Sequence, residues 1–226
     1  MYDSPGDDEF VTAPTYGLLI GDGFSIQGTS FDEVNVYAIA GGYDVTKMYD
    51  SPDDDEFYAT PVEGAIYSDS FRTRAKFFEE IHGDSSAGGS DTAYLHDTSG
   101  RDTFIATPTY AELSGPEFRS QATDFDKVEA HATAGEYDVA RLYDSPGDDI
   151  FWTTPTFGAL MPRPRASAWR VVGREEPGLP SRPPTPSHEV LRPVPCGPRR
   201  DRAVAARDVV RGRSVADRPS AHTAGA

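Results

Sequence analysis

YDSPGDDEF, residues 2–10, recurs along the chain at a constant spacing of 47 residues. It returns as YDSPDDDEF at 49–57, as HDTSGRDTF at 96–104 and as YDSPGDDIF at 143–151. A fixed period in this range is typical of repeat architectures, in which each unit buries its apolar face by stacking on the next. We therefore predict repeats at residues 2–48, 49–95 and 96–142, followed by a partial repeat at 143–161.

Within the first repeat, short segments of alternating polar and apolar residues are separated by clusters of Gly, Pro, Asp and Ser. This pattern predicts short β-strands joined by turns. Strands are expected at residues 9–13, 16–20, 24–27, 31–39 and 44–49. The repeat region is therefore expected to be all-β.

A half-period inside the repeat favours a parallel β-solenoid, or β-roll. Phe10 and Val34 are 24 residues apart and Val34 and Phe57 are 23 apart, which predicts two coils per repeat. Propeller-like blades are the alternative, since blades have similar lengths. Recurrent phenylalanines are predicted to fill a continuous core: Phe10, Phe57, Phe104 and Phe151; Phe24, Phe71 and Phe118; Phe31, Phe78 and Phe125.

Composition changes abruptly between residues 161 and 162. Residues 1–161 contain 8 Lys and Arg against 31 Asp and Glu, whereas residues 162–226 contain 13 Arg against 6 acidic residues and 11 of the 19 prolines. We predict a disordered, Pro/Arg-rich tail at 162–226. The change interrupts a repeat, and residues 162–226 contain no Phe, Tyr, Ile, Asn or Lys, the residues with AT-rich codons. A shift of reading frame is therefore an alternative origin of the tail. Nucleic-acid binding is not expected, because the tail offers no aromatic platform beyond Trp169.

Targeting and redox signals are sparse. The chain has no apolar run of about 18 residues, the length that a membrane-spanning helix needs. Its first residues lack the basic and apolar regions of a signal peptide. The single cysteine, Cys196, excludes a disulfide within the chain. Since the chain starts and stops inside a repeat, we expect it to be a fragment of a larger protein.

Aspartates recur in columns that follow the repeat. Stacked coils would align equivalent carboxylates about 5 Å apart, where like charges repel and require solvation or a cation. Asp8 is expected to point outward, with Phe10 turned into the core. Oxygen-rich glycine turns suit Ca²⁺, although Asp-Ser-Pro-Gly also forms a good turn without any ligand. The candidate metal ligands are Asp8, Asp44, Asp55, Asp91, Asp102, Asp138 and Asp149.

Parts of these turns resemble a known calcium-binding repeat. Residues 6–10 (GDDEF) and 147–151 (GDDIF), together with the GGYD and GGSD turns at 41–44 and 88–91, are similar to the nonapeptide of RTX proteins, G-G-x-G-x-D-x-U-x, although the nine-residue spacing is absent. The whole unit also resembles tandem arrays of giant bacterial surface proteins. The resemblance covers residues 1–161 and implies a β-roll with Ca²⁺ between coils and a secreted or cell-surface location.

Repetition of the acidic turns argues against catalysis, since a catalytic site is normally built once. We expect a non-catalytic structural or adhesive module, with neighbouring repeats, surface glycans or other surface proteins as partners. Two alternatives remain open: a fragment of a carbohydrate-active β-helix enzyme, and a truncated gene product without independent function.

Overall fold

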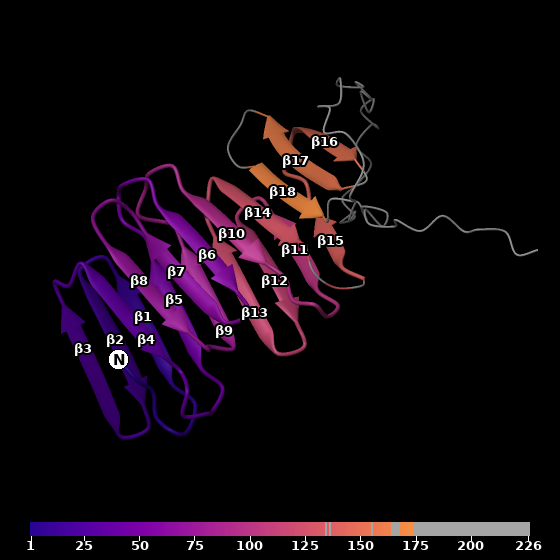
Figure 1. Cartoon of the computed structure of the whole chain (residues 1–226). Helices are drawn as coiled ribbons and strands as arrows, with labels where there is room; N and C mark the ends of the chain where they lie inside the picture. Colours follow the sequence, from indigo (N-terminus) through magenta and orange to yellow (C-terminus); the bar gives the residue numbers. More distant parts are fainter. Residues whose placement is uncertain (134, 136, 155, 164–167, 174–226) are drawn as a thin grey trace, which may run out of the picture.

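The computed structural model describes residues 1–133, 135, 137–154, 156–163 and 168–173. These residues form strands and no helix, and they build a β-solenoid of about four turns (Figure 1). The predicted fold class is thus confirmed. None of the described segments is a helix that would cross a membrane.

The described strands follow one pattern per repeat: a three-stranded meander and then two single strands. Their bounds are β1 Glu9–Ala13, β2 Tyr16–Gly21, β3 Phe24–Thr29, β4 Glu33–Tyr37, β5 Val45–Tyr49, β6 Glu56–Thr60, β7 Glu63–Tyr67, β8 Arg72–Lys76, β9 Glu80–Asp84, β10 Thr92–His96, β11 Thr103–Thr107, β12 Tyr110–Gly115, β13 Phe118–Thr123, β14 Lys127–Ala132, β15 Val139–Leu142, β16 Asp148–Thr154, β17 Phe157–Arg163 and β18 Ala168–Gly173.

Two sheets of nine strands form the two faces of the solenoid. The first has the order β15-β11-β12-β13-β9-β5-β1-β2-β3, and the second has the order β16-β17-β18-β14-β10-β6-β7-β8-β4. Within a meander the strands pair antiparallel, as β1, β2 and β3 do. Successive turns pair in parallel, as β1 does with β5 and β5 with β9. The strands therefore do not form propeller blades.

Each repeat makes one and a half turns, where the sequence predicted two coils. The meander β1–β3 lies in the first sheet, β4 in the second and β5 again in the first, so the next meander, β6–β8, begins in the second sheet. Repeat-equivalent strands of consecutive copies therefore lie in opposite sheets. The half-period was misleading because the meander adds two antiparallel strands to one face without advancing the chain around the coil.

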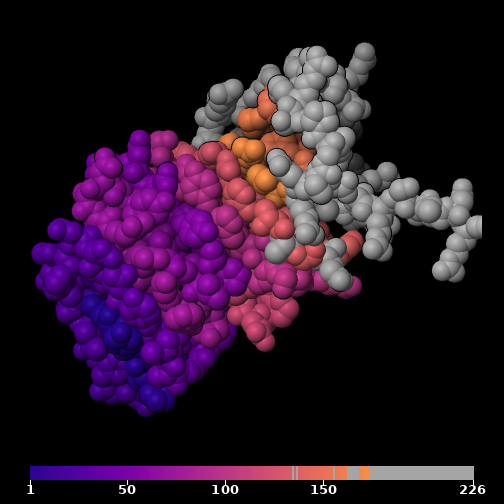
Figure 2. Space-filling model, in the orientation of Figure 1, coloured from indigo at the N-terminus to yellow at the C-terminus, as the bar shows by residue number. Residues whose placement is uncertain are grey.

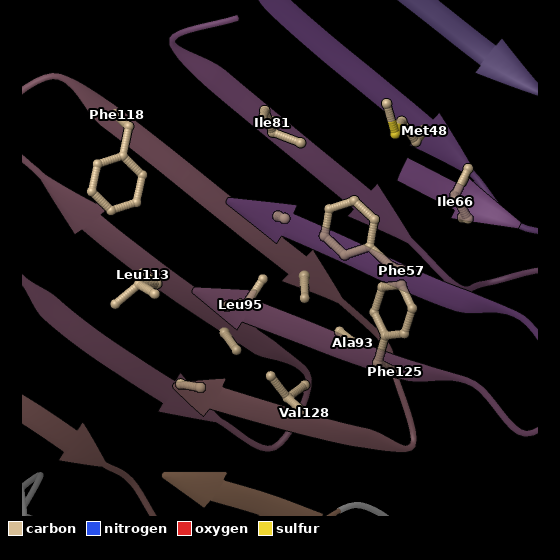
Figure 3. Close-up of a cluster of buried hydrophobic side chains, with 14 of the residues drawn as sticks. Met48, Phe57, Ile66, Ile81, Ala93, Leu95, Leu113, Phe118, Phe125 and Val128 are labelled. Carbon is tan, nitrogen blue, oxygen red and sulfur yellow. The ribbon is translucent and has the colours of Figure 1, made fainter. Parts of the chain in front are cut away.

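The core lies between the two sheets and is filled by the recurrent aromatic and aliphatic residues. Phe10, Phe57 and Phe104 are buried. The rings of Phe57 and Phe125 stack with centroids 5.6 Å apart, and Figure 3 shows them side by side in the core. The predicted core is thus found in the middle copies. It is wrong for Phe31 and Phe151, which are 62% and 41% exposed near the two ends of the stack.

The strands continue past the predicted boundary at residue 161. β17 ends at Arg163, and β18 pairs in parallel with β14, with Trp169 opposite Val128. Trp169 belongs to the buried core cluster. The remainder of the predicted disordered tail, residues 164–167 and 174–226, lies outside the described residues.

Phe78→Ala and Phe31→Ala form a matched pair that tests the stacking of turns. Phe78 is 1% exposed, whereas the repeat-equivalent Phe31 is 62% exposed. We expect Phe78→Ala to lower the free energy of unfolding by about 3–5 kcal/mol, the usual cost of deleting a buried aromatic ring. Phe31→Ala should cost less than about 1 kcal/mol. Urea unfolding followed by circular dichroism measures both, and equal losses would contradict this assignment of the core.

Candidate metal centre

In each of the first three repeats, three aspartates meet at a corner of the solenoid. In each group, one carboxylate oxygen per residue lies within 4.8 Å of the others. We call these groups the aspartate triads. They consist of Asp3, Asp8 and Asp44; Asp50, Asp55 and Asp91; and Asp97, Asp102 and Asp138.

The acidic turn is the segment that joins the first two aspartates of a triad, residues 50–55 in the second repeat, and it folds around the second of them. The Asp55 carboxylate accepts hydrogen bonds from Ser51 N at 2.9 Å and from Ser51 Oγ at 2.8 Å. Asp102 accepts the same pair of bonds from Thr98, at 3.0 and 2.7 Å. An Asp that binds a backbone N–H nearby in sequence stabilises a tight turn. This explains why a hydroxyl residue stands four positions before the aspartate in each copy.

The third aspartate comes from the next turn of the solenoid and binds back to the acidic turn. Asp55 N donates to Asp91 Oδ1 at 2.8 Å, while Ala87 N donates to both Asp50 oxygens at 3.0 and 3.1 Å. The first repeat has the same arrangement, with Asp8 N donating to Asp44 Oδ1 at 2.8 Å. Each triad therefore joins two turns that are adjacent in space and about 36 residues apart in sequence.

A fourth acidic position in the repeat, outside the triads, accepts a hydrogen bond from the backbone of a triad aspartate in the preceding repeat. Asp44 N donates to Glu79 Oε2 at 2.7 Å, and Asp91 N donates to Asp126 Oδ2 at 3.0 Å. Glu79 and Asp126 occupy equivalent places in their repeats. Carboxylates at these positions thus bind backbone amides of the preceding repeat.

Glycine is required where the GG turns pass over the acidic turns. Gly42 and Gly89 have φ values of +141° and +119°, a region that residues with a Cβ avoid. A Cβ would lie 2.1 Å from the carbonyl oxygen of Gly6 in the first case and of Asp53 in the second. The two glycines therefore allow the close approach of the turns that brings Asp44 and Asp91 into their triads.

Several triad oxygens are buried and have no hydrogen-bond partner among the described residues. Asp55 and Asp102 are each only 1% exposed, and Oδ1 of both is unpartnered, as is Asp3 Oδ1 in the first triad. Buried polar atoms are nearly always hydrogen-bonded, and a buried unpaired charge is costly. The triads therefore present oxygens that a cation would satisfy.

Burial raises the pKa of these carboxyls. It raises the pKa of Asp44 and of Asp91 to about 6, with backbone hydrogen bonds from Asp8 and Asp55 opposing the change and neighbouring carboxylates adding to it. Burial also raises the pKa of Asp50, Asp55 and Asp138. A cation bound beside these carboxyls would stabilise their ionised form and lower their pKa.

Several positive side chains of the described residues pair with glutamates on the sheet faces. Examples are Lys47 with Glu9 at 2.5 Å and Lys127 with Glu129 at 2.8 Å. The charges that act on the pKa of Asp91 come from other aspartates. The Asp91 carboxylate therefore lies in a cluster of other carboxylates.

The third triad borders a small enclosed space. Asp102 and Asp138 line a cavity of about 30 Å³ together with mostly apolar residues such as Phe104 and Val171. This space has about the volume of one water molecule. It is too small for an organic substrate.

The structure brings together six of the seven predicted metal ligands, two in each triad: Asp8 and Asp44, Asp55 and Asp91, Asp102 and Asp138. Sequence reasoning did not select Asp3, Asp50 and Asp97, although they recur as regularly as the others. Asp149 is hydrogen-bonded by Ser145 at 2.8 Å and lies outside the three triads.

Two expectations about these aspartates were wrong. Asp8 does not point outward, since it is 3% exposed. Equivalent carboxylates such as Asp8 and Asp55 do not stack into a ladder, because they precede strands of opposite sheets. Each triad instead combines aspartates from three different positions of one repeat, as Asp3, Asp8 and Asp44 do.

Comparison with known proteins gives no further indication of function. The chain matches no family model, no curated protein and no solved structure. The site is therefore interpreted from its own geometry.

The raised pKa values predict an unusual pH dependence for the metal-free protein. The folded state holds the protons of Asp44 and Asp91 up to about pH 6, whereas the unfolded chain loses them near the ordinary aspartate pKa of 3.8. The contribution of these two carboxyls to stability therefore falls as pH rises from about 4 to 6. In the presence of a chelator, Asp44→Asn/Asp91→Asn should raise the melting temperature relative to the parent at pH 7 and change it less at pH 4.

Scanning calorimetry at both pH values measures this difference. Asp53→Asn, which changes an exposed aspartate of the same turn type, is the control, and its melting temperature should differ little from that of the parent at either pH. A melting-temperature difference between the double variant and the parent that is the same at pH 4 and pH 7 would contradict the assignment.

Proposed function

We propose that this chain is a non-catalytic structural repeat module whose aspartate triads bind Ca²⁺ and thereby fix consecutive turns of the solenoid to one another. One observation carries the proposal. Three aspartates converge in each of three repeats, join two turns, and include a buried carboxylate oxygen that has no hydrogen-bond partner among the described residues.

The donor set favours Ca²⁺ among common cations. The triads offer only carboxylate oxygens, whereas Zn²⁺ sites use mainly Cys and His. Ca²⁺ accepts about six to eight oxygen ligands in flexible geometry, and Mg²⁺ demands near-ideal octahedral geometry. A triad with neighbouring carbonyls and water suits the flexible ion, and the Asp50, Asp55 and Asp91 carboxylates would hold it in the second repeat.

A bound ion would stabilise the fold by linking turns. Asp50 and Asp55 belong to one turn and Asp91 belongs to the next, so an ion between them bridges segments that separate when the solenoid unfolds. A free Ca²⁺ concentration of about 100 times the dissociation constant adds about 2.7 kcal/mol per site to the free energy of unfolding. Neutralisation of three adjacent carboxylates would also remove their mutual repulsion.

A structural or adhesive role at the cell surface, or after secretion, agrees with these features. The acidic solenoid presents two long β-faces, and millimolar Ca²⁺ outside cells would keep the triads occupied. Recurrence of the same triads argues against a catalytic function, since no copy is singled out. Neighbouring repeats, surface glycans and surface proteins are the partners that such faces would serve.

Calorimetric titration with Ca²⁺ tests the proposal. The parent should bind close to three ions and melt at a higher temperature when saturated. Asp55→Asn should remove one site and leave the other two, because it changes only the second triad. Asp53→Asn, an exposed residue of the same acidic turn, should bind as the parent does. Absence of heat and of stabilisation at millimolar Ca²⁺, or equal effects of the two variants, would refute calcium binding by the triads.

A further inference from the structure

The first repeat leaves inward-facing side chains exposed at one end of the solenoid. Ile26 on β3 is 44% exposed, whereas the equivalent Thr73 and Ser120 are buried. Phe31 is likewise exposed, although its equivalents in the next two repeats are buried. Figure 2 shows this N-terminal end, coloured indigo, at the surface of the molecule. The core is therefore open at this end.

Backbone pairing is also incomplete at this end among the described residues. The third strand of each later meander pairs in parallel with the fourth strand of the repeat before it, as β8 does with β4 and β13 with β9. β3 is the third strand of the first meander and is the last strand of its sheet. Its outer edge therefore lacks the partner that β8 and β13 have.

Asp32 provides a third sign of the same missing contact. Its equivalents Glu79 and Asp126 accept hydrogen bonds from Asp44 N and Asp91 N of the preceding repeat. The Asp32 side chain is exposed and has no such partner among the described residues. An acceptor for a backbone N–H thus stands beside an unpaired edge and an open core.

We propose that the edge of β3 binds the fourth strand and following GG turn of another 47-residue repeat of the same type. The interface would continue the one already present between turns. The register follows from the molecule itself, because Thr73 lies opposite Val34 and Ser120 opposite Ile81. Ile26 would therefore lie opposite an apolar residue, and Asp32 would accept the N–H of the aspartate that ends the GG turn.

Strand addition of this kind gives affinity through main-chain hydrogen bonds and specificity through alternate side chains. The neighbouring edge of β4 is already partly covered, since Tyr2 pairs with Tyr37 and the two rings stack at 5.3 Å. Binding should therefore centre on β3. The inference concerns strand pairing and does not depend on the proposed metal sites.

A synthetic peptide of residues 79–93, which carries β9 and the GGSD turn, serves as the probe for the full chain. The peptide stops before the positions that correspond to Met1 and Tyr2. Fluorescence anisotropy of the labelled peptide should show one-to-one binding, and hydrogen exchange should show new protection of amides in β3. Ile26→Asp in the protein, or Ile81→Asp in the peptide, should weaken binding at least tenfold.

Several results would overturn the inference: no binding to the parent, equal binding to the Ile26→Asp variant, or protection confined to β15 and β16. Protection of β3 that rises with protein concentration without peptide would show that two copies pair through this edge, and would overturn the assigned occupant. Circular dichroism of Ile26→Asp confirms that the variant is folded. Repeating the titration with Ca²⁺ and with a chelator separates strand addition from metal binding, since the peptide should bind in both conditions.

Discussion

The stack of turns depends on carboxylates that bind backbone amides of the neighbouring turn. In the second repeat the bonds are reciprocal: Asp91 accepts from Asp55 N, and Asp50 accepts from Ala87 N. These bonds satisfy backbone amides that lie outside the regular strand pairing at each corner. Buried backbone N–H groups require such partners. The bonds also bury negative charge, and this burial raises the pKa of Asp91 to about 6. The corner that holds the turns together is thus also the place where buried carboxylates gather.

One and a half turns per repeat decide where these corners lie. The triads of the first and third repeats form where the chain passes from the second sheet to the first, and the triad of the second repeat forms where it passes back. A single sequence motif therefore supports both edges of the solenoid. This arrangement places the triads of consecutive repeats at opposite edges of the solenoid.

Local features of the fold could be predicted from the sequence, and long-range ones could not. The first strand, Glu9–Ala13, was predicted at its exact bounds, because polar and apolar alternation is a local property. The number of turns per repeat was not, since antiparallel pairing within a meander leaves the same alternation as parallel pairing between turns. Burial of Asp8 was missed because charge alone suggests exposure. Ser4, four residues earlier, and the positive φ of Gly42 are the features that explain it.

Anomalous diffraction from crystals grown with Ca²⁺ tests the central claim most directly. We predict a peak among the carboxylates of Asp50, Asp55 and Asp91, with oxygen distances of about 2.3–2.6 Å, and equivalent peaks in the first and third repeats. We also predict that Asp55 Oδ1, unpartnered among the described residues, is a ligand. Crystals without peaks at the triads, or with ions held only by glutamates on the sheet faces, would contradict the account.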